Sequence, residues 1–155
     1  MVEDYASAEE LDTPDRDLLA KAVQASDTAY SPYSSFRVGA AVRLADGQII
    51  IGNNQENAAY PSGLCAERVA LFYAQASYPG LAVDAIAIYA NSSDFKLQKP
   101  VTPCGACRQV IAEYEHRHNV KTRIIMANGS GEVQAVNGAE NLLPLMFYLE
   151  ELKKH

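Results

Sequence analysis

The segments CAER, at residues 65–68, and PCGAC, at residues 103–107, decide how this chain folds and what it can bind. They hold Cys65, Cys104 and Cys107, which are all three cysteines of the chain. Three thiolates can bind a zinc ion and leave its fourth tetrahedral position open, whereas structural zinc sites normally close all four positions with protein ligands. The pattern therefore predicts a catalytic zinc site that binds one ion per chain.

A fourth protein ligand would make this site structural, and the three histidines are the candidates. His116 and His118 fall in the helix expected at residues 104–118, where a rise of about 1.5 Å per residue puts His116 roughly 18 Å from Cys104 along the axis. His155 stays open as a ligand on geometry, although the last residue of a chain is usually solvated. We therefore favour an open site over a closed one.

The length of 155 residues fits a single domain with a substantial core. We expect residues 14–155 to form this domain and the acidic residues 1–13 to be a flexible extension. The extension has neither the basic region nor the apolar region of a secretory signal, which favours a cytoplasmic location. No apolar run approaches the roughly 20 residues that span a bilayer, so no membrane association is expected.

The chain is acidic, with 19 Asp and Glu residues, 13 Lys and Arg residues and a formal net charge of -6 at pH 7. Proteins that bind a phosphate backbone use clustered basic side chains. The compact basic groups here, at residues 117–123 and 153–154, are interpreted as a solvated helix face and tail. We therefore expect a small neutral substrate and no nucleic-acid partner.

The hydrophobic pattern predicts alternating helices and strands. Expected helices cover residues 14–29, 65–75, 104–118 and 139–148, and expected strands cover residues 36–44, 48–51, 84–90, 122–126 and 132–136. This order predicts an α/β fold in three layers, a mixed sheet of about five strands with helices on both faces. The strand at residues 84–90 is largely apolar, so it should be buried on both faces. Each cysteine segment then begins a helix.

Two charged residues follow Cys65 and can support chemistry at the metal. Zinc lowers the pKa of its bound water towards neutrality, and a carboxylate such as Glu67 can take a proton and return it as general base and acid. A glutamate in the first helical turn can also serve the helix dipole alone, but its place beside a thiolate ligand favours catalysis. Arg68 lies three residues after Cys65 on the same helix face and is predicted to donate hydrogen bonds to ligand sulfurs, with an exposed surface arginine as the alternative.

Four longer segments resemble the homotetrameric class of cytidine deaminase. They are YSPYSSFRVGAAV at residues 30–42, GNNQENAAYPSGLCAERVA at 52–70, TPCGACRQV at 102–110 and ENLLPLMF at 140–147. Chance agreement at so many separated motifs is improbable. The resemblance implies a cytidine deaminase-like fold, the zinc ligands and proton shuttle proposed above, and pyrimidine salvage by hydrolysis of cytidine and 2′-deoxycytidine to uridine and 2′-deoxyuridine plus ammonia.

The resemblance also implies a set of contacts with a nucleoside substrate. Asn54 and Glu56 would hydrogen-bond the ribose 3′-hydroxyl, Phe36 would pack on the pyrimidine ring, and the backbone N–H of Ala66 would meet the base. An aromatic face suits a flat base, and a carboxylate with an amide suits a sugar hydroxyl. Without the resemblance, Asn54 and Glu56 would be interpreted as a solvated loop and Phe36 as core.

Other residues of the family pattern act between subunits. The resemblance implies that Ala58 and Tyr60 reach the 5′ end of a neighbour's substrate and that Phe147 closes a neighbour's site, which predicts a homotetramer with shared active sites. Packing within one chain is the alternative for Tyr60 and Phe147. The chain departs from the family pattern in its acidic extension, in a long loop at residues 91–99 and in the charged tail at 148–155. These departures bear on oligomer contacts and lid behaviour and leave the reaction unaffected.

Three other functions stay open at this point. A deaminase of a modified cytosine nucleoside, such as a blasticidin S deaminase, shares the layout of the cysteine segments. A C-x-x-C at a helix start also resembles a thiol-disulfide site, although that function leaves Cys65, Glu67 and Arg68 unexplained. A polynucleotide deaminase would have to capture a base from a strand, which the acidic charge disfavours.

Overall fold

The computed structural model describes residues 1–148 and residue 152, so the expected charged tail and His155 lie largely outside the described residues. The strands are β1 (Val2–Tyr5), β2 (Phe36–Leu44), β3 (Ile49–Asn53), β4 (Val83–Ser92), β5 (Arg123–Asn128) and β6 (Val133–Asn137). The helices are α1 (Thr13–Ser26), α2 (Ala66–Ser77) and α3 (Gly105–His118), with single 3₁₀ turns at Ala8–Glu10, Tyr60–Ser62 and Ala139–Asn141.

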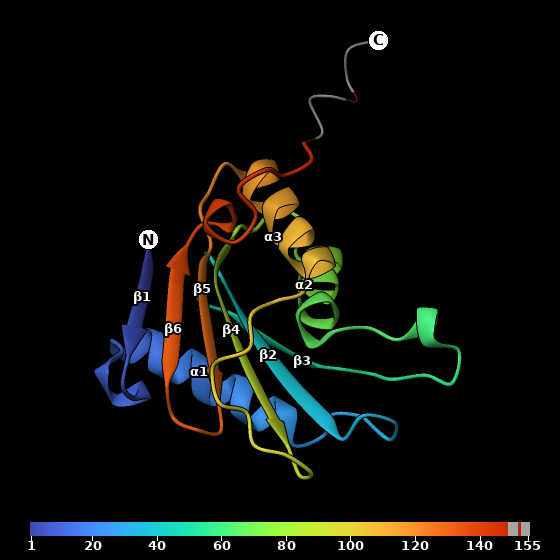
Figure 1. The fold of residues 1–155 in the computed structure, drawn as a ribbon. Coiled ribbons are helices and arrows are strands. Elements are labelled where there is room, and N and C mark those ends of the chain that lie inside the picture. The colour runs from blue at the N-terminus through green and yellow to red at the C-terminus, as the bar shows by residue number, and fades with distance from the viewer. Residues whose placement is uncertain (149–151, 153–155) are drawn as a thin grey trace.

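The six strands form one mixed sheet in the order β1-β6-β5-β4-β2-β3 (Figure 1). Strands β4 and β5 are parallel, and every other neighbouring pair is antiparallel. Helix α1 covers one face of the sheet, and helices α2 and α3 pack on the other. The predicted three-layer α/β class is confirmed, with six strands in place of the expected five.

The additional strand is β1, which pairs with β6 at the edge of the sheet. Val2 lies opposite Val136, and Tyr5 lies opposite Val133. Arg123 of β5 also binds this segment, because it donates to a Glu3 carboxylate oxygen at 2.7 Å and to the Tyr5 hydroxyl at 3.0 Å. Residues 2–5 of the segment that was expected to be a flexible extension therefore form an edge strand, and the Glu3 carboxylate in it pairs with Arg123 of β5.

Two apolar cores lie on opposite faces of the sheet, because successive side chains of a strand point in opposite directions. On β4, Ile86 and Ile88 belong to the core beneath α2 and α3, whereas Ala85 and Ala87 belong to the core beneath α1. The prediction that this strand is buried on both faces is confirmed.

Close packing against the sheet fixes where α2 lies. A Cβ atom built on Gly52 of β3 would come within 2.7 Å of the backbone nitrogen of Ala70 and 2.9 Å of the carbonyl oxygen of Ala66. Both of those atoms belong to α2, so only glycine lets the helix approach β3 this closely. This contact sets the position of the first turn of α2, which carries Glu67 and Arg68.

The helix predicted at residues 139–148 is wrong beyond its first turn. After the 3₁₀ turn Ala139–Asn141, residues 142–148 are not helical, because Pro144 lacks the N–H that an interior helical position requires. Side chains of α3 hold this segment instead: Arg108 donates to the carbonyl oxygen of Leu142 at 2.7 Å, and Gln109 donates to that of Phe147 at 2.8 Å.

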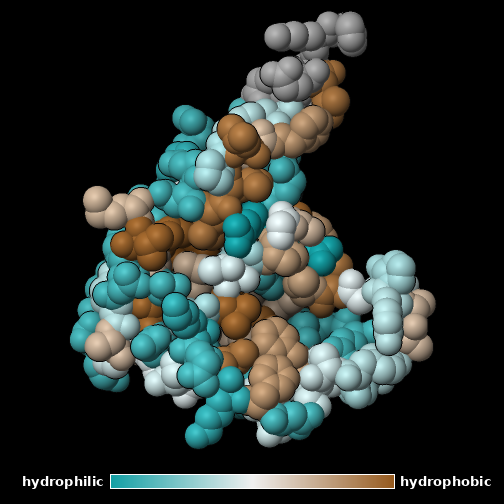
Figure 2. Space-filling model, viewed as in Figure 1, coloured by the Kyte–Doolittle hydropathy of each residue, from teal (hydrophilic) through white to brown (hydrophobic). Residues whose placement is uncertain are grey.

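The described surface is mixed in hydropathy. Figure 2 shows hydrophilic residues over much of one face, with hydrophobic surface in its middle and near the C-terminal end of the described chain. Leu145 and Phe147 are among the exposed large apolar residues, with 95% and 60% of their surface accessible. None of the described helices is both long enough and apolar enough to cross a membrane.

Candidate active site

The ends of two helices bring the three cysteines together. Cys65 is the residue immediately before α2, and Cys104 is the residue immediately before α3, while Cys107 lies in the first turn of α3. The sulfur of Cys104 is 3.8 Å from that of Cys65 and 3.5 Å from that of Cys107. All three Sγ atoms lie within 4.8 Å of one another, so the predicted cluster forms.

This donor set fits a zinc ion. Tetrahedral coordination with Zn–S bonds of about 2.3 Å separates neighbouring sulfurs by roughly 3.8 Å, close to the spacing of these atoms. Among the described residues the cluster consists of the cysteines alone. His118 lies at the far end of α3, where it hydrogen-bonds Gln75 at 2.9 Å, and His116 contacts the ring of Tyr148. The histidines of α3 are therefore engaged away from the cluster, as the helix geometry predicted.

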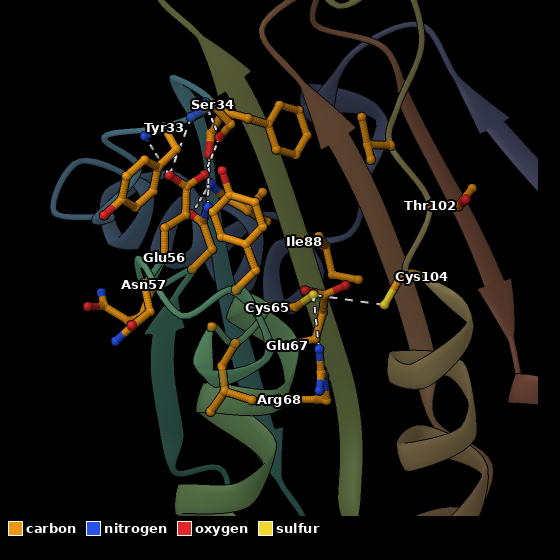
Figure 3. Close-up of a pocket in the computed structure, with 18 residues that line it drawn as sticks. Tyr33, Ser34, Glu56, Asn57, Cys65, Glu67, Arg68, Ile88, Thr102 and Cys104 are labelled. Carbon is orange, nitrogen blue, oxygen red and sulfur yellow. Dashed lines mark hydrogen bonds between the residues drawn. The ribbon is translucent and has the colours of Figure 1, made fainter.

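The surroundings of Cys65 favour the thiolate that a metal needs. A hydrogen bond from Cys107 and a second one from Arg68 lower the pKa of the Cys65 thiol to about 5, although burial opposes the shift. Conversely, the pKa of Cys107 is raised, because its proton is held against the Cys65 sulfur. The guanidinium Nη2 of Arg68 lies 3.4 Å from that sulfur (Figure 3). The predicted hydrogen bond from Arg68 to a cluster sulfur is therefore present.

Glu67 is buried beside the cluster, where it interacts with Cys65 and Cys107. Its side chain is only 5% exposed, and it lines the same cavity as Cys65 and Cys104. Burial raises the pKa of this carboxyl group, because the charged form loses its hydration. A buried carboxyl group that lines a cavity next to a metal-ligand cluster is well placed to exchange protons with a bound molecule.

The cavity above the cluster has a volume of about 570 Å³. Its lining residues come from the segment before β2, the start of β2, the loop before α2, the first turn of α2, β4 and the loop before α3. They include Tyr33, Ser34, Phe36, Asn54, Glu56, Tyr60, Cys65, Glu67, Arg68, Ile88, Thr102 and Cys104. The structure thus gathers most of the site residues predicted from the sequence. By contrast, Ala58 and Phe147 are exposed and stand apart from the residues that line this cavity.

Hydrogen bonds hold the polar wall of the cavity in place. One Glu56 carboxylate oxygen accepts from the backbone N–H of Tyr33 at 2.8 Å and of Ser34 at 3.3 Å, and the other accepts from the Ser34 hydroxyl (Figure 3). The Ser34 hydroxyl is also the main cause of the lowered pKa of Glu56. Asn54 attaches the loop before α2 to β2. Its Oδ1 accepts a hydrogen bond from the Val38 N–H, and its Nδ2 donates one to the carbonyl oxygen of Phe36, both at 2.8 Å.

Comparison with known proteins identifies the family. The sequence model of the family described as "Cytidine and deoxycytidylate deaminase zinc-binding region" matches residues 12–122. The chain belongs to this family. The zinc-binding character of the family agrees with the three-cysteine cluster, which lies within the matched segment.

Individual relatives cover nearly the whole chain. A cytidine deaminase from Halalkalibacterium halodurans is 45% identical over 139 residues, which are 89% of this chain and 98% of that protein. A cytidine deaminase from Sporosarcina psychrophila is 42% identical over 135 residues, 87% of this chain and 92% of the relative. Among solved structures, the cytidine deaminase of Burkholderia pseudomallei superposes with a TM-score of 0.73 at 39% identity, covering 84% of this chain and 97% of that one.

Tyr33, Ser34 and Thr102 are among the residues of the cavity wall that the sequence interpretation missed. Tyr33 and Ser34 hold Glu56 through backbone N–H groups, a function that no side-chain pattern reveals. Tyr33 also makes an edge contact with Tyr60, with ring centroids 6.0 Å apart and planes at 64°. Thr102 lines the cavity and accepts a hydrogen bond from Arg108 at 2.9 Å. The position of Tyr33 and Ser34 inside the YSPYSSF segment was the one available signal.

Proposed function

We propose that this protein is a cytidine deaminase that hydrolyses cytidine and 2′-deoxycytidine to uridine and 2′-deoxyuridine, with release of ammonia. The observation that carries the proposal is that one cavity brings the three-cysteine cluster and the buried Glu67 together with the aromatic ring of Phe36. The two relatives at 42% and 45% identity are both named cytidine deaminase, which supports the same reaction.

In this proposal Cys65, Cys104 and Cys107 hold one zinc ion per chain. When bound, zinc lowers the pKa of a water molecule so that it can act as a nucleophile near neutral pH. The helix N-termini that carry the cysteines favour anionic sulfur, because unpaired N–H groups and the helix dipole point towards it. Arg68 donates a hydrogen bond to Cys65 and so draws negative charge from the thiolates.

Glu67 moves the protons of the reaction. Its carboxylate takes a proton from the water that attacks C4 of the cytosine ring and delivers that proton to N3. It then takes the proton of the new C4 hydroxyl group and passes it to the amino group, which leaves as ammonia while C4 becomes a carbonyl carbon. One carboxyl group suffices for both transfers, because it is regenerated after each of them.

The remaining cavity residues bind the nucleoside. Phe36 packs on the pyrimidine ring, and the backbone N–H of Ala66, at the first position of α2, meets the base. Asn54 and Glu56 hydrogen-bond the ribose 3′-hydroxyl. The hydrogen bonds from Tyr33 and Ser34 support this assignment, because they hold the Glu56 carboxylate in one orientation before any substrate binds.

We further propose a homotetramer with shared active sites, formed from single deaminase domains of residues 14–155. Its support is the exposure of aromatic side chains around the cavity and at the C-terminal end, with 76% of Tyr60 and 60% of Phe147 accessible in one chain. Such large exposed apolar side chains are typical of interaction surfaces. Tyr60 and Ala58 then contact a neighbour's substrate, and Phe147 covers a neighbour's cavity.

The proposal places the enzyme in pyrimidine salvage in the cytoplasm, with a neutral nucleoside as its partner and without nucleic acid. The three cysteines are free of disulfide bonds and must remain so to bind zinc, which fits a reducing compartment such as the cytoplasm. The relatives found do not favour a deaminase of a modified cytosine nucleoside.

The test is turnover by zinc-loaded protein. Cytidine, 2′-deoxycytidine and blasticidin S are supplied in parallel, and the loss of the cytosine absorbance is followed together with ammonia release. Stoichiometric ammonia from both plain nucleosides is expected. Turnover of blasticidin S alone would transfer the protein to the modified-nucleoside class.

A further inference from the structure

The loop between β4 and α3 packs against the first residue of β2, Phe36. The ring of Phe95 stacks on the ring of Phe36, with centroids 6.3 Å apart and planes only 5° from parallel. Phe36 lines the 570 Å³ cavity, whereas Phe95 lines a separate hollow of about 440 Å³ together with Lys96 and Leu97. Phe95 therefore supports the Phe36 ring from outside the main cavity.

A second contact joins the residues that precede these two rings. Ser35 has a φ of +54°, a left-handed conformation that few residues other than glycine adopt. Interaction with the Ser35 side chain is the main cause of the lowered pKa of the exposed Asp94 carboxyl group. Two consecutive loop residues, Asp94 and Phe95, thus meet two consecutive residues at the start of β2, Ser35 and Phe36.

Hydrogen bonds on both sides of Phe95 hold the loop in place. Ser93 donates to the Asp94 carboxylate at 2.8 Å, and the backbone N–H of Asp94 donates to Ser92 at 3.2 Å. Further along, the buried side chain of Asn128 donates to the carbonyl oxygen of Leu97 at 3.1 Å. These bonds give the loop a fixed position from which it can support β2.

We propose that Phe95 is a positioning residue that holds the Phe36 ring in the orientation in which it receives the pyrimidine. The inference rests on the proposed function, in which Phe36 packs on the base. Glu56 anchors the segment just before β2, because it accepts hydrogen bonds from the backbone N–H groups of Tyr33 and Ser34. The Phe36 ring is thereby held from two sides, by Phe95 and by the segment that Glu56 anchors, and it is oriented before substrate arrives.

Because Phe95 acts on base binding and lies apart from the cysteines and Glu67, its loss should change KM more than kcat. Phe95→Ala is expected to raise KM for cytidine roughly two- to tenfold, the range that an offset-stacked aromatic pair accounts for. Phe95→Tyr keeps the ring and should retain the wild-type KM. Lys96→Ala, an exposed neighbour in the same loop, is the matched control.

A double-mutant cycle tests whether Phe95 acts through Phe36. In a Phe36→Leu background, Phe95→Ala should produce no further rise in KM, while zinc content and melting temperature stay those of the parent. An equal rise in both backgrounds, an unchanged KM in Phe95→Ala, or a loss confined to kcat would overturn the inference while leaving wild-type turnover intact. Absence of turnover by zinc-loaded wild type would instead overturn the proposed function and the inference with it.

Discussion

Replacing Gly52 by alanine should disturb the active site from the opposite side of α2. The added Cβ would lie 2.7 Å from the backbone nitrogen of Ala70 and 2.9 Å from the carbonyl oxygen of Ala66. Backbone atoms cannot rotate away, so β3 and α2 must separate by roughly 0.7 Å before the contact reaches the 3.4 Å of ordinary packing. Overpacking of this kind costs about 1–3 kcal/mol of unfolding free energy.

The same separation moves the helix turn that carries Glu67. A misplacement of about 1 Å in a catalytic group can cost on the order of 100-fold in rate, so kcat of Gly52→Ala should fall by roughly 10- to 100-fold. Urea unfolding measures the free-energy change, and cytidine turnover measures kcat at equal zinc content. Gly80→Ala is the control, because its Cβ meets nothing within 4 Å and its φ is unexceptional.

Equal stability and equal kcat in Gly52→Ala and Gly80→Ala would refute this reasoning. That result would mean that α2 can withdraw from β3 without cost, and that the close approach at Gly52 does not fix the position of the site.

Three further perturbations test other parts of the structure. Arg68→Ala removes the hydrogen bond to Cys65 and should weaken zinc affinity by roughly 10- to 100-fold in a chelator competition; an unchanged affinity would contradict the role given to this arginine. Glu3→Gln should cost up to about 1 kcal/mol at pH 7, a small value because the Glu3 side chain is 42% exposed. The hydrogen bond from Arg123 is the main reason why the pKa of Glu3 is lowered from 4.5 to about 2. The stabilisation is therefore present above pH 4.5 and is lost as the pH falls towards 2. In urea titrations, the difference in unfolding free energy between wild type and Glu3→Gln should narrow over that pH range. The buried Glu115 carboxylate accepts hydrogen bonds from the backbone N–H groups of Thr122 at 2.8 Å and Ala139 at 3.0 Å. Glu115→Ala leaves both N–H groups without an acceptor and should lower the unfolding free energy by about 2–5 kcal/mol, whereas Glu115→Gln keeps an oxygen there and should cost less. Equal losses in urea unfolding would argue against the acceptor role.

Local patterns predicted the elements that carry the cysteines. Cys65 and Cys104 each precede a helix as expected, and β4 is buried on both faces because its residues 85–90 are all apolar or aromatic. The strand β1 was missed because its stability comes from a distant partner. The acidic composition of the first residues suggests a solvated, disordered segment. The pairing of β1 with β6 makes it part of the sheet, and Glu3 adds a contact with Arg123, 120 positions away in the sequence.

The candidate site divides in the same way. Cys107 and Glu67 could be predicted because their chemistry depends on side-chain type and short spacing, and the structure brings both to the cluster and cavity. The support that Tyr33 gives to Glu56 could not be predicted, because a backbone N–H leaves no trace in residue identity. The stacking of Phe95 on Phe36 joins residues far apart in the chain, so it too required the fold.

The central claim is that Glu67 moves protons at a zinc site built from three cysteines. The most direct measurement compares cytidine turnover by wild type and Glu67→Gln, with zinc determined in the same samples. The account predicts about one zinc per chain in both proteins and a loss of at least roughly 100-fold in kcat for the variant, the lower end of what general acid–base catalysis supplies. A zinc-loaded Glu67→Gln protein that deaminates cytidine at the wild-type rate would contradict it.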